Sequence, residues 1–368
     1  MPDAKNSNPA GVRLALGLMS GTSLDGIDAA LLWTDGVRIE KTGPTATFPY
    51  EASLRDGLRG VLGGNGPVQE VERALTEAHA SAIDGFLSDA GISKDAIDVI
   101  GFHGHTILHR PNQDKTWQIG DGPLLAALCG IDVICDLRSN DVANGGQGAP
   151  IVPLYHQALS RDLEKPVCVL NIGGVANLTW IGADEADLIA FDTGPGNALL
   201  DEWTEVNTGK IFDENGELAK AGTTDQGVLK SLLSNAYFDA APPKSLDRID
   251  FNLAALSGLS PADGAATLTA FTCETVARAE RLLPEPPGSW LVTGGGRHNP
   301  VMMDGLNEVL TAPVAPVEAV GWNGDALEAQ AFAYLAVRGL DGLPLTVPST
   351  TGVSKPVTGG RLYRHEAD

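Results

Sequence analysis

An apolar run broken by a glycine-rich turn occurs twice in this chain, at residues 14–33 and again at residues 167–181. In each copy the apolar run, which is suited to a buried strand, stops at Gly with Ser, Thr or Asn and then resumes, a pattern typical of a β-hairpin. The first copy predicts paired strands over 12–19 and 27–33. The repetition predicts a duplicated fold in which each half carries such a hairpin, and two ordinary tight turns are the alternative interpretation.

Helical and extended patterns alternate along the rest of the chain. Helical periodicity over 68–90 ends at Gly91, and a buried strand is expected over 97–102, with the motif HGHT at its end. The other expected elements are a helix over 123–129 with Asp121 as N-cap, a strand that ends at the motif FDTGPGN (191–197), helices over 265–283 and 324–337, and a strand, turn and helix start in SWLVTGGGRHNP. This alternation on two similar halves predicts an α/β fold with two related lobes.

The domain division follows from the positions of the two hairpins. Lobe I is expected over 10–135, and residues 348–368 can join it; lobe II is expected over 136–347. The polar, glycine-rich stretch 139–150 is either a linker or a substrate loop, and the charged Arg138 and Asp141 favour the loop.

The composition limits the kinds of partner that this chain can bind. The 368 residues suit two domains with a cleft between them, and 25 Lys and Arg against 47 Asp and Glu give a formal net charge of −22. That charge repels nucleic acid and anionic membranes, so a small-molecule partner is expected. No apolar run is long enough for a membrane span, and the four cysteines lack metal-binding spacing, so we expect a cytoplasmic enzyme with reduced core thiols.

The turns of both hairpins have the composition of a phosphate site. Glycine lets backbone N–H groups approach a ligand closely, and hydroxyl or amide side chains add donors, so each turn can surround phosphate oxygens. A third glycine-rich turn follows at 293–296. The P-loop pattern GxxxxGK[ST], the dinucleotide pattern GxGxxG after the first strand and the zinc motif HExxH are all absent. A hydrolase elbow at Ser23 fails because Asp25 stands where GxSxG requires glycine.

Seven motifs in order, spread over most of the chain, resemble the anhydro-N-acetylmuramic acid kinase family: GLMSGTSLDGID, HGHT with HRP, IGDG, NDVANGGQGAP, NIGGVANLT, FDTGPGN and VTGGGRHN. The family belongs to the sugar kinase, Hsp70 and actin superfamily. The resemblance therefore implies two lobes of actin/hexokinase-like (ribonuclease H-like) architecture with an interdomain cleft. It also implies an enzyme of cell-wall sugar recycling that opens the 1,6-anhydro ring of N-acetylmuramic acid with water and transfers the γ-phosphate of ATP to O6.

The same resemblance assigns residues to ATP and Mg²⁺. The residues implied to bind ATP are Ser20, Gly21, Thr22, Ser23, Asp25 and Gly26 in the first hairpin, Gly173, Gly174 and Asn177 in the second, and Gly294, Gly295, Gly296 and Asn299 on the adenosine side. Asp25 is the expected Mg²⁺ residue, through water. Local hydrogen bonding within the hairpin is the alternative for Asp25 and Asp28.

The family's catalytic aspartate matches Asp192, which we expect to deprotonate the attacking water, although capping of the following helix is the alternative role. On the sugar side the expected residues are His103, Thr106, Arg138 and Asp141, with Arg138 on the lactyl carboxylate, and any one of them can instead be structural. Glu328 is a further sugar-side carboxylate or a solvated helix charge. Where family members commonly carry Gln after HG, this chain has His105.

Two rival functions share the nucleotide site. One is a kinase for another hexose or amino sugar on the same fold, and the other is an ATP-binding chaperone-like or actin-like module with a protein partner. A homodimer is compatible with the sequence.

Overall fold

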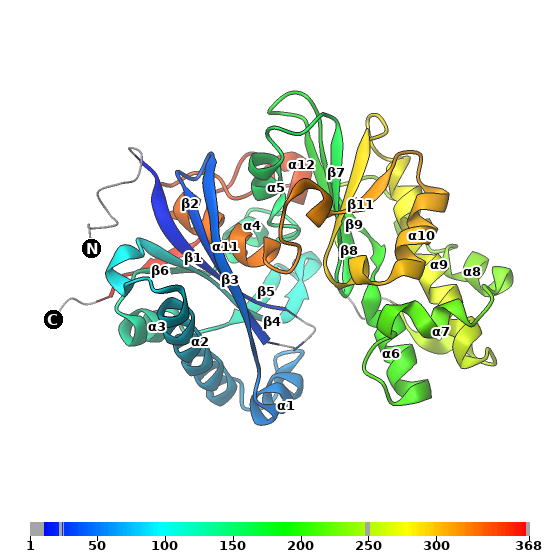
Figure 1. Ribbon diagram of the computed structural model, residues 1–368, viewed down its shortest axis with the longest axis horizontal. Coiled ribbons are helices and arrows are strands. Elements are labelled where there is room, and N and C mark those ends of the chain that lie inside the picture. Colours follow the sequence, from blue (N-terminus) through cyan, green and yellow to red (C-terminus); the bar gives the residue numbers. More distant parts are fainter. Residues whose placement is uncertain (1–10, 22–23, 25, 247–250, 366–368) are drawn as a thin grey trace. The chain divides into compact units, whose positions relative to one another are not determined.

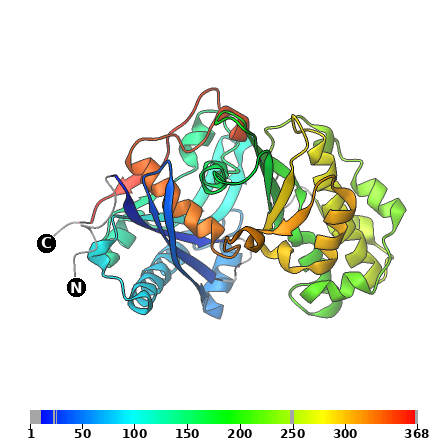
Figure 2. The same ribbon diagram turned by 45° about the horizontal axis from the view of Figure 1, so that its top comes forward.

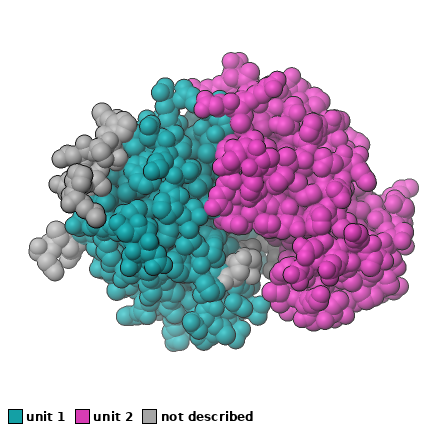
Figure 3. Space-filling view, in the orientation of Figure 1, with its two compact units in different colours: residues 1–161, 326–368 teal, residues 162–325 magenta. Residues whose placement is uncertain are grey.

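The computed structural model describes residues 11–21, 24, 26–246 and 251–365. The chain forms two compact units: unit 1 is Met1–Arg161 with Ala326–Asp368, and unit 2 is Asp162–Asp325 (Figure 3). These boundaries differ from the predicted ones at 135/136 and 347/348. The difference arises because the helix Leu327–Leu340 packs on the strands of unit 1, and because residues 136–161, which were predicted to open lobe II, belong to unit 1.

Unit 1 is built on one mixed sheet. Its strands are β1 (Arg13–Ser20), β2 (Gly26–Thr34), β3 (Ile39–Pro49), β4 (Val99–Arg110), β5 (Lys115–Ile119), β6 (Val133–Cys135) and β12 (Arg361–Tyr363). They lie in the order β12-β6-β4-β1-β2-β3, with β5 paired to β4. The first three strands are antiparallel, whereas β4 is parallel to β1 and β6 is parallel to β4. The chain end returns to this unit, because β12 pairs antiparallel with β6.

Helices cover both faces of the unit 1 sheet (Figures 1 and 2). The helices of unit 1 are α1 (Ala52–Val61), α2 (Val68–Ala90), α3 (Gly122–Cys129), α4 (Ser139–Ala143), α5 (Pro153–Leu159), α11 (Leu327–Leu340) and α12 (Pro348–Thr351), with 3₁₀ turns at Lys94–Ala96 and Pro111–Gln113. Leu16 and Leu18 of β1 join the apolar cluster that Leu75 and Ile83 of α2 also form. Because side chains alternate along a strand, Gly17 faces the opposite side, where α11 lies.

Two glycines seat α11 directly on the sheet. Gly17 of β1 and Gly101 of β4 are register partners. A Cβ at Gly17 would lie 1.8 Å from the Ala329 carbonyl oxygen, and one at Gly101 would lie 2.1 Å from that of Phe332. No other residue would allow the helix backbone to come this close, so these two positions set the depth of α11, the helix that carries Glu328.

Unit 2 repeats the same strand order. Its strands are β7 (Val167–Ile172), β8 (Val175–Ile181), β9 (Leu188–Pro195), β10 (Ser289–Thr293) and β11 (Val314–Pro316). They are ordered β11-β10-β7-β8-β9, with an antiparallel first trio and parallel later strands. This order and these directions match β6-β4-β1-β2-β3 of unit 1. The duplicated two-lobe α/β fold expected from the twin hairpins is therefore confirmed.

One face of the unit 2 sheet carries its core. The helices are α6 (Asn197–Thr208), α7 (Glu217–Lys220), α8 (Gln226–Leu232), α9 (Pro261–Glu280) and α10 (Pro300–Val309), with 3₁₀ turns at Glu214–Gly216, Ala236–Asp239, Leu253–Leu256, Gly295–His298 and Val317–Val320. Leu170, Leu178 and Phe191 join the apolar cluster of α9. The alternate residues of these strands, among them Asn171, Asn177 and Asp192, face the other side of the sheet.

Several predicted elements are confirmed. The first hairpin is β1 and β2, α2 ends at Gly91 in the left-handed conformation, and Asp121 caps α3 by accepting a hydrogen bond from the Leu124 N–H. Among the described residues, no helix combines the length and apolar character that a membrane crossing requires.

Three local expectations are wrong. HGHT does not end a strand, because β4 continues to Arg110 through a shift in register and pairs with β5. The stretch 139–150 is not all loop, since it begins with helix α4. Asp192 does not lie at the lip of its sheet but inside β9, where it is a register partner of Asn177.

Candidate functional site

The second hairpin turn, Gly173 and Gly174, is held by the start of α6. The N–H groups of Gly196 and Ala198 donate to the Gly174 carbonyl, and that of Asn197 donates to the Gly173 carbonyl. Since the C=O and N–H of a trans peptide point in opposite directions, the N–H groups of Gly174 and Val175 face away from α6. A Cβ on Gly173 would meet nothing closer than 3.7 Å. This turn therefore has the open, donor-lined form that a phosphate group requires.

Asp192 lies in β9, which pairs with the strand that follows this turn, and a backbone N–H group donates a hydrogen bond to its carboxylate. Its side chain is buried, and Oδ2 accepts a hydrogen bond of 2.8 Å from the Leu246 N–H. The cap of α6 is Gly196, without a side-chain hydrogen bond. The capping role for Asp192 is therefore wrong, and its carboxylate is held by a different segment of unit 2.

That segment is fixed by a buried lysine. Lys244 donates from Nζ to the Tyr237 carbonyl at 2.8 Å, and its own carbonyl accepts from the Asp192 N–H at 3.0 Å. The Tyr237 hydroxyl in turn donates to the Asp192 carbonyl at 2.7 Å. Burial lowers the pKa of Lys244 to about 8. Lys244 and Tyr237 thus hold the backbone that presents Leu246 to Asp192.

A row of polar side chains crosses the unit 2 sheet at this level. Thr293 is the register partner of Asn171, Asn171 of Asn177, and Asn177 of Asp192. Register partners point to the same face of a sheet, and this face is opposite the one that carries the apolar cluster. The row therefore marks the same level on three strands: β7, which leads into the second hairpin turn, β10, which leads into the adenosine turn, and β9, which leads into α6.

The predicted adenosine turn follows β10. Gly294 has φ of +75°, and a Cβ there would lie 2.4 Å from Asn171 Oδ1, so glycine is required. Gly295 and Gly296 continue into the 3₁₀ turn. Asn299 is buried and accepts from the Val301 and Met302 N–H groups through Oδ1, which makes it the N-cap of α10. Its side-chain oxygen thus has a structural role in addition to any contact with a ligand.

The first hairpin is described only in part. Thr22, Ser23 and Asp25 lie outside the described residues, whereas Gly21 accepts a turn hydrogen bond from the Leu24 N–H. Gly26 starts β2, where a Cβ would lie 2.3 Å from the Phe48 carbonyl oxygen, so its glycine serves the close pairing of β2 with β3.

Ser20, predicted on ATP, is buried in a polar chain. Its Oγ accepts from the Tyr50 hydroxyl and lies 2.8 Å from Nδ1 of His105. Burial lowers the pKa of His105 to about 4, with the Ser20 contact opposing that shift. The residue that replaces the family's usual Gln is thus a neutral histidine that supports the end of β1.

His103 and Arg138 form the centre of the predicted sugar-side residues. Arg138 Nε donates to His103 Nε2 at 3.1 Å, and Arg138 Nη1 donates to the Gly148 carbonyl at 2.8 Å. Burial first, and the Arg138 charge second, lower the pKa of His103 well below its usual value. Its ring stacks on Phe332 of α11 at 4.5 Å. The pair therefore combines a neutral imidazole with a guanidinium that keeps its charge.

Asp141 holds the glycine-rich stretch that follows α4. Its Oδ1 accepts from the Gly148 N–H at 2.6 Å, and its Oδ2 accepts from the hydroxyls of Thr346 and Thr351. A Cβ at Gly146 would collide with the same carboxylate. Asp141 therefore shapes the stretch from within, and its predicted contact with the sugar stays a prediction.

The remaining sugar-side residues are placed as follows. Thr106 accepts from Gln118 Nε2 at 3.2 Å and precedes Ile107, which belongs to the apolar cluster under α2, so Thr106 faces away from that cluster. Glu328 is exposed in the first turn of α11. A cavity of about 380 Å³ in unit 1 includes His103 in its wall, together with Trp117, Asp121, Asp136, Ser139 and Tyr363. Of the predicted sugar-side residues only His103 lines it.

Nothing in the described part of the chain assembles three or more His, Cys, Asp or Glu side chains around a metal position. Mg²⁺ is usually held by one or two carboxylates and by phosphate oxygens, so this finding is compatible with a metal that arrives with a nucleotide.

Sequence reasoning missed the supports of the site. Lys244, Tyr237, Asn171 and Arg297 carry no catalytic signature by themselves; Arg297 donates from Nη1 to the Gly294 carbonyl of the adenosine turn at 3.0 Å. The sequence offered two signals: Asn171, which lies two residues before Gly173, and Arg297, which directly follows three glycines. Both positions become meaningful only when the strand register is known.

Comparison with known proteins gives one family for nearly the whole chain. The family model for anhydro-N-acetylmuramic acid kinase matches residues 13–365. The anhydro-N-acetylmuramic acid kinase of Paramagnetospirillum magneticum is 58% identical over 353 residues, covering 95% of this chain and 99% of the relative. That of Rhizorhabdus wittichii is 53% identical over 360 residues, with coverage of 95% and 99%.

Solved structures give weaker matches. The (R)-2-hydroxyglutaryl-CoA dehydratase component A of Acidaminococcus fermentans is 13% identical, with a TM-score of 0.46 and coverage of 89% of this chain and 98% of that one. A ROK family glucokinase from Streptomyces griseus, in complex with glucose and AMPPNP, is 16% identical, with a TM-score of 0.39 and coverage of 88% and 99%.

Two units of one strand order, with a glycine-lined hairpin turn and a glycine-rich turn after β10, define a duplicated two-lobe α/β protein. Within that class, the chain belongs to the anhydro-N-acetylmuramic acid kinase family. The chaperone-like or actin-like module of the sequence analysis therefore loses its support.

Proposed function

We propose that this chain uses water to open 1,6-anhydro-N-acetylmuramic acid and transfers the γ-phosphate of ATP to the released O6, which gives N-acetylmuramic acid 6-phosphate. The observation that carries the proposal is the family match, which spans residues 13–365. The proposed compartment is the cytoplasm.

Asp192 has the role of general base in this proposal. Its Oδ2 accepts a hydrogen bond from the Leu246 N–H, which restricts the orientation of the carboxylate. A base of fixed orientation can take a proton from the water that attacks the anomeric carbon, while the departing O6 becomes the nucleophile toward phosphorus. The C1–O6 bond breaks and the C1–O(water) bond forms, while Asp192 takes the proton of the water. The bond between the γ-phosphorus of ATP and the β–γ bridging oxygen breaks, the O6–P bond forms, and ADP leaves.

The phosphates of ATP fit the outward N–H groups of Gly174 and Val175, and its adenosine fits the Gly294–Gly296 turn. Mg²⁺, when bound, would neutralise phosphate charge, and Asp25 is the residue proposed to hold it through water. On the sugar side, Arg138 would bind the lactyl carboxylate and neutral His103 would orient a polar group of the ring.

The test follows oxygen atoms. The protein is incubated with the anhydro sugar, ATP and Mg²⁺ in ¹⁸O-labelled water, and products are read by mass spectrometry. We expect a sugar 6-phosphate with one label at the C1 oxygen and unlabelled phosphate. Label found in phosphate alone, or turnover of free N-acetylmuramic acid in preference to the anhydro sugar, would overturn the proposal.

A further inference from the structure

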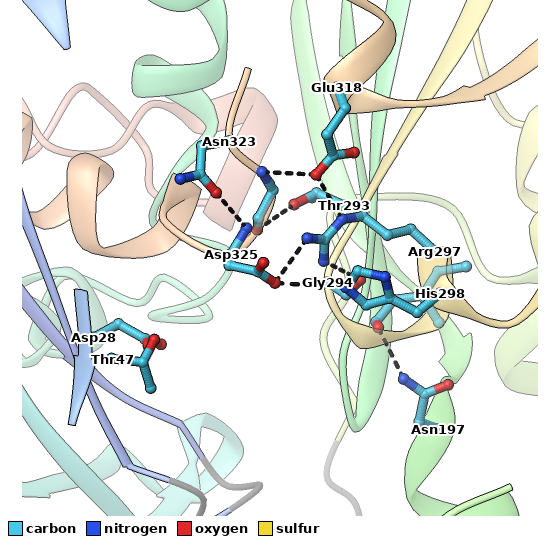
Figure 4. A network of polar contacts seen from close by, with 12 residues as sticks. Asp28, Thr47, Asn197, Thr293, Gly294, Arg297, His298, Glu318, Asn323 and Asp325 are labelled. Carbon is cyan, nitrogen blue, oxygen red and sulfur yellow. Dashed lines mark hydrogen bonds and ion pairs between the residues drawn. The ribbon is translucent and has the colours of Figure 1, made fainter. Parts of the chain in front are cut away.

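Arg297 is buried at the base of the adenosine turn and bonded on all sides. Its side chain is 3% exposed. Nη1 donates to the Gly294 carbonyl at 3.0 Å, Nε donates to Glu318 Oε1 at 3.0 Å, and Nη2 donates to Asp325 Oδ1 at 2.7 Å (Figure 4). One guanidinium thus joins the first glycine of the turn to two carboxylates of a later segment.

The backbone of Gly324 is locked to the same group. Its N–H donates to Glu318 Oε1 at 3.1 Å, and its carbonyl accepts from the Thr293 hydroxyl at 3.1 Å. A Cβ at Gly324 would lie 2.4 Å from Arg297 Nε, so the guanidinium lies directly against this glycine. Residues 324 and 325 are therefore clamped to both ends of the Thr293–Arg297 stretch.

Residues 324 and 325 lie where the chain passes from unit 2 back to unit 1. Asp325 is the last residue of unit 2, and Ala326 is the first residue of the part that returns to unit 1. Leu327 then opens α11, whose first turn contains Glu328. Whatever orders the Gly294–Gly296 turn consequently orders the point at which the chain leaves unit 2.

We infer that Arg297 is a positioning residue for nucleotide binding. It holds the Gly294 carbonyl, and with it the glycine turn, in the shape that receives adenosine, and it ties that shape to the segment that leads into α11. A guanidinium suits this task, because its planar fork serves three acceptors at once while it stays charged at every relevant pH. The inference rests on the proposed function, since it assumes that this turn binds a nucleotide.

The test separates nucleotide affinity from folding and from chemistry. Arg297→Met removes all three hydrogen bonds at similar length. We expect the KM for ATP to rise about tenfold or more while the KM for the anhydro sugar stays within about twofold. Arg297→Lys, which keeps the charge but loses the fork, is expected to fall between the wild type and Arg297→Met. Gly324→Ala, which pushes the guanidinium aside, is expected to show the same split as Arg297→Met.

The matched control is Arg278→Met in the same unit. Arg278 is also partly buried and donates from Nη1 to a backbone carbonyl, that of Leu233, at 2.7 Å. Equal KM values for ATP in Arg297→Met and Arg278→Met would overturn the inference, as would a parallel loss of kcat and of both affinities. If Arg297→Met does not fold, Asp325→Ala takes its place, because the Asp325 side chain is 68% exposed.

Calorimetric titration with a non-hydrolysable ATP analogue and Mg²⁺ keeps the two proposals apart. If the wild type binds the analogue but does not convert the anhydro sugar, the proposed function fails and the binding comparison between wild type and Arg297→Met still decides the inference. If the wild type converts the sugar and Arg297→Met binds the analogue as the wild type does, the inference alone fails.

Discussion

Arg138 Nε donates a hydrogen bond to Nε2 of His103 at 3.1 Å, and this contact fixes which ring nitrogen carries the proton. Nε2 must be an acceptor, so the proton is on Nδ1, which lies 2.9 Å from the Gly104 carbonyl. His103 is therefore neutral near pH 7, in agreement with its lowered pKa. A neutral ring beside a permanent cation can bind an anionic, hydroxyl-rich ligand without titrating itself.

His103→Gln is expected to raise the KM for the anhydro sugar about tenfold, because a flexible amide replaces a ring that Arg138 and Phe332 hold in place. The KM for ATP is expected to stay within about twofold of the wild type. Steady-state kinetics with each substrate varied in turn measures both. His109→Gln is the control, since His109 is a half-buried histidine of the same strand that contacts Thr116. An unchanged sugar KM in His103→Gln removes His103 from the sugar site.

Asp192→Asn is expected to lower kcat by a factor on the order of 10² to 10⁴, the usual contribution of a general base, while nucleotide binding persists. The amide can still accept from the Leu246 N–H but cannot take a proton. Single-turnover rates and calorimetric ATP titration measure the two quantities. Asp225→Asn serves as the control, because Asp225 caps α8 and Asn caps a helix equally well. Near-normal turnover of Asp192→Asn would exclude Asp192 as the base.

Lys244→Met is expected to lower kcat about tenfold with little change in the KM for ATP, because the backbone at Leu246 loses its anchor. Burial sets the pKa of Lys244 to about 8, so the wild type is expected to lose kcat as pH rises above 8 and the ammonium loses its proton. Lys244→Arg, charged throughout, is expected to shift this loss to higher pH. Lys165→Met is the control, since burial also lowers the pKa of Lys165 to about 8. Identical pH profiles for the wild type and Lys244→Arg would exclude this role.

Gly17→Ala is expected to destabilise the protein by about 3 kcal/mol or more, since the new methyl group would overlap the Ala329 carbonyl and force α11 off the sheet. Gly101→Ala is expected to act in the same way against Phe332. Urea unfolding measures the change in the free energy of unfolding. Gly60→Ala is the control: it lies in helix α1 with nothing within 4 Å of a Cβ, and it is expected to stabilise by up to about 1 kcal/mol. If Gly17→Ala and Gly60→Ala changed the free energy of unfolding equally, glycine at position 17 would not be required for α11 to pack on the sheet.

The sequence predicts the repeated hairpins well, because glycine turns between apolar runs are local signals. It predicts the strand over 97–102 but not its continuation to Arg110, because that continuation depends on pairing with β5. The sequence does not predict the domain boundaries for a similar reason. Helix α11 belongs to unit 1 because it packs against Gly17 and Gly101, which are far from it in sequence. The same holds for Lys244, which donates to backbone carbonyls, and for Arg297, which donates to a backbone carbonyl and to the carboxylates of Glu318 and Asp325; no motif records these contacts.

Buried neutral histidines are expected to make the protein unstable in mild acid. His79 is fully buried, with Nδ1 2.8 Å from the Leu75 carbonyl, its ring against Phe102 and, in the described part of the chain, no hydrogen-bond partner for Nε2. Burial, with a smaller contribution from His105, lowers its pKa to about 4, while the unfolded chain binds the proton near 6.5. Between these values the unfolded state holds more protons, so the free energy of unfolding falls as pH drops from about 6.5 to 4, by on the order of 3 kcal/mol for this residue. His79→Leu, which cannot bind a proton, is expected to flatten the dependence of the urea midpoint on pH across that window. A slope in His79→Leu as steep as that of the wild type would show that His79 does not contribute to the acid sensitivity.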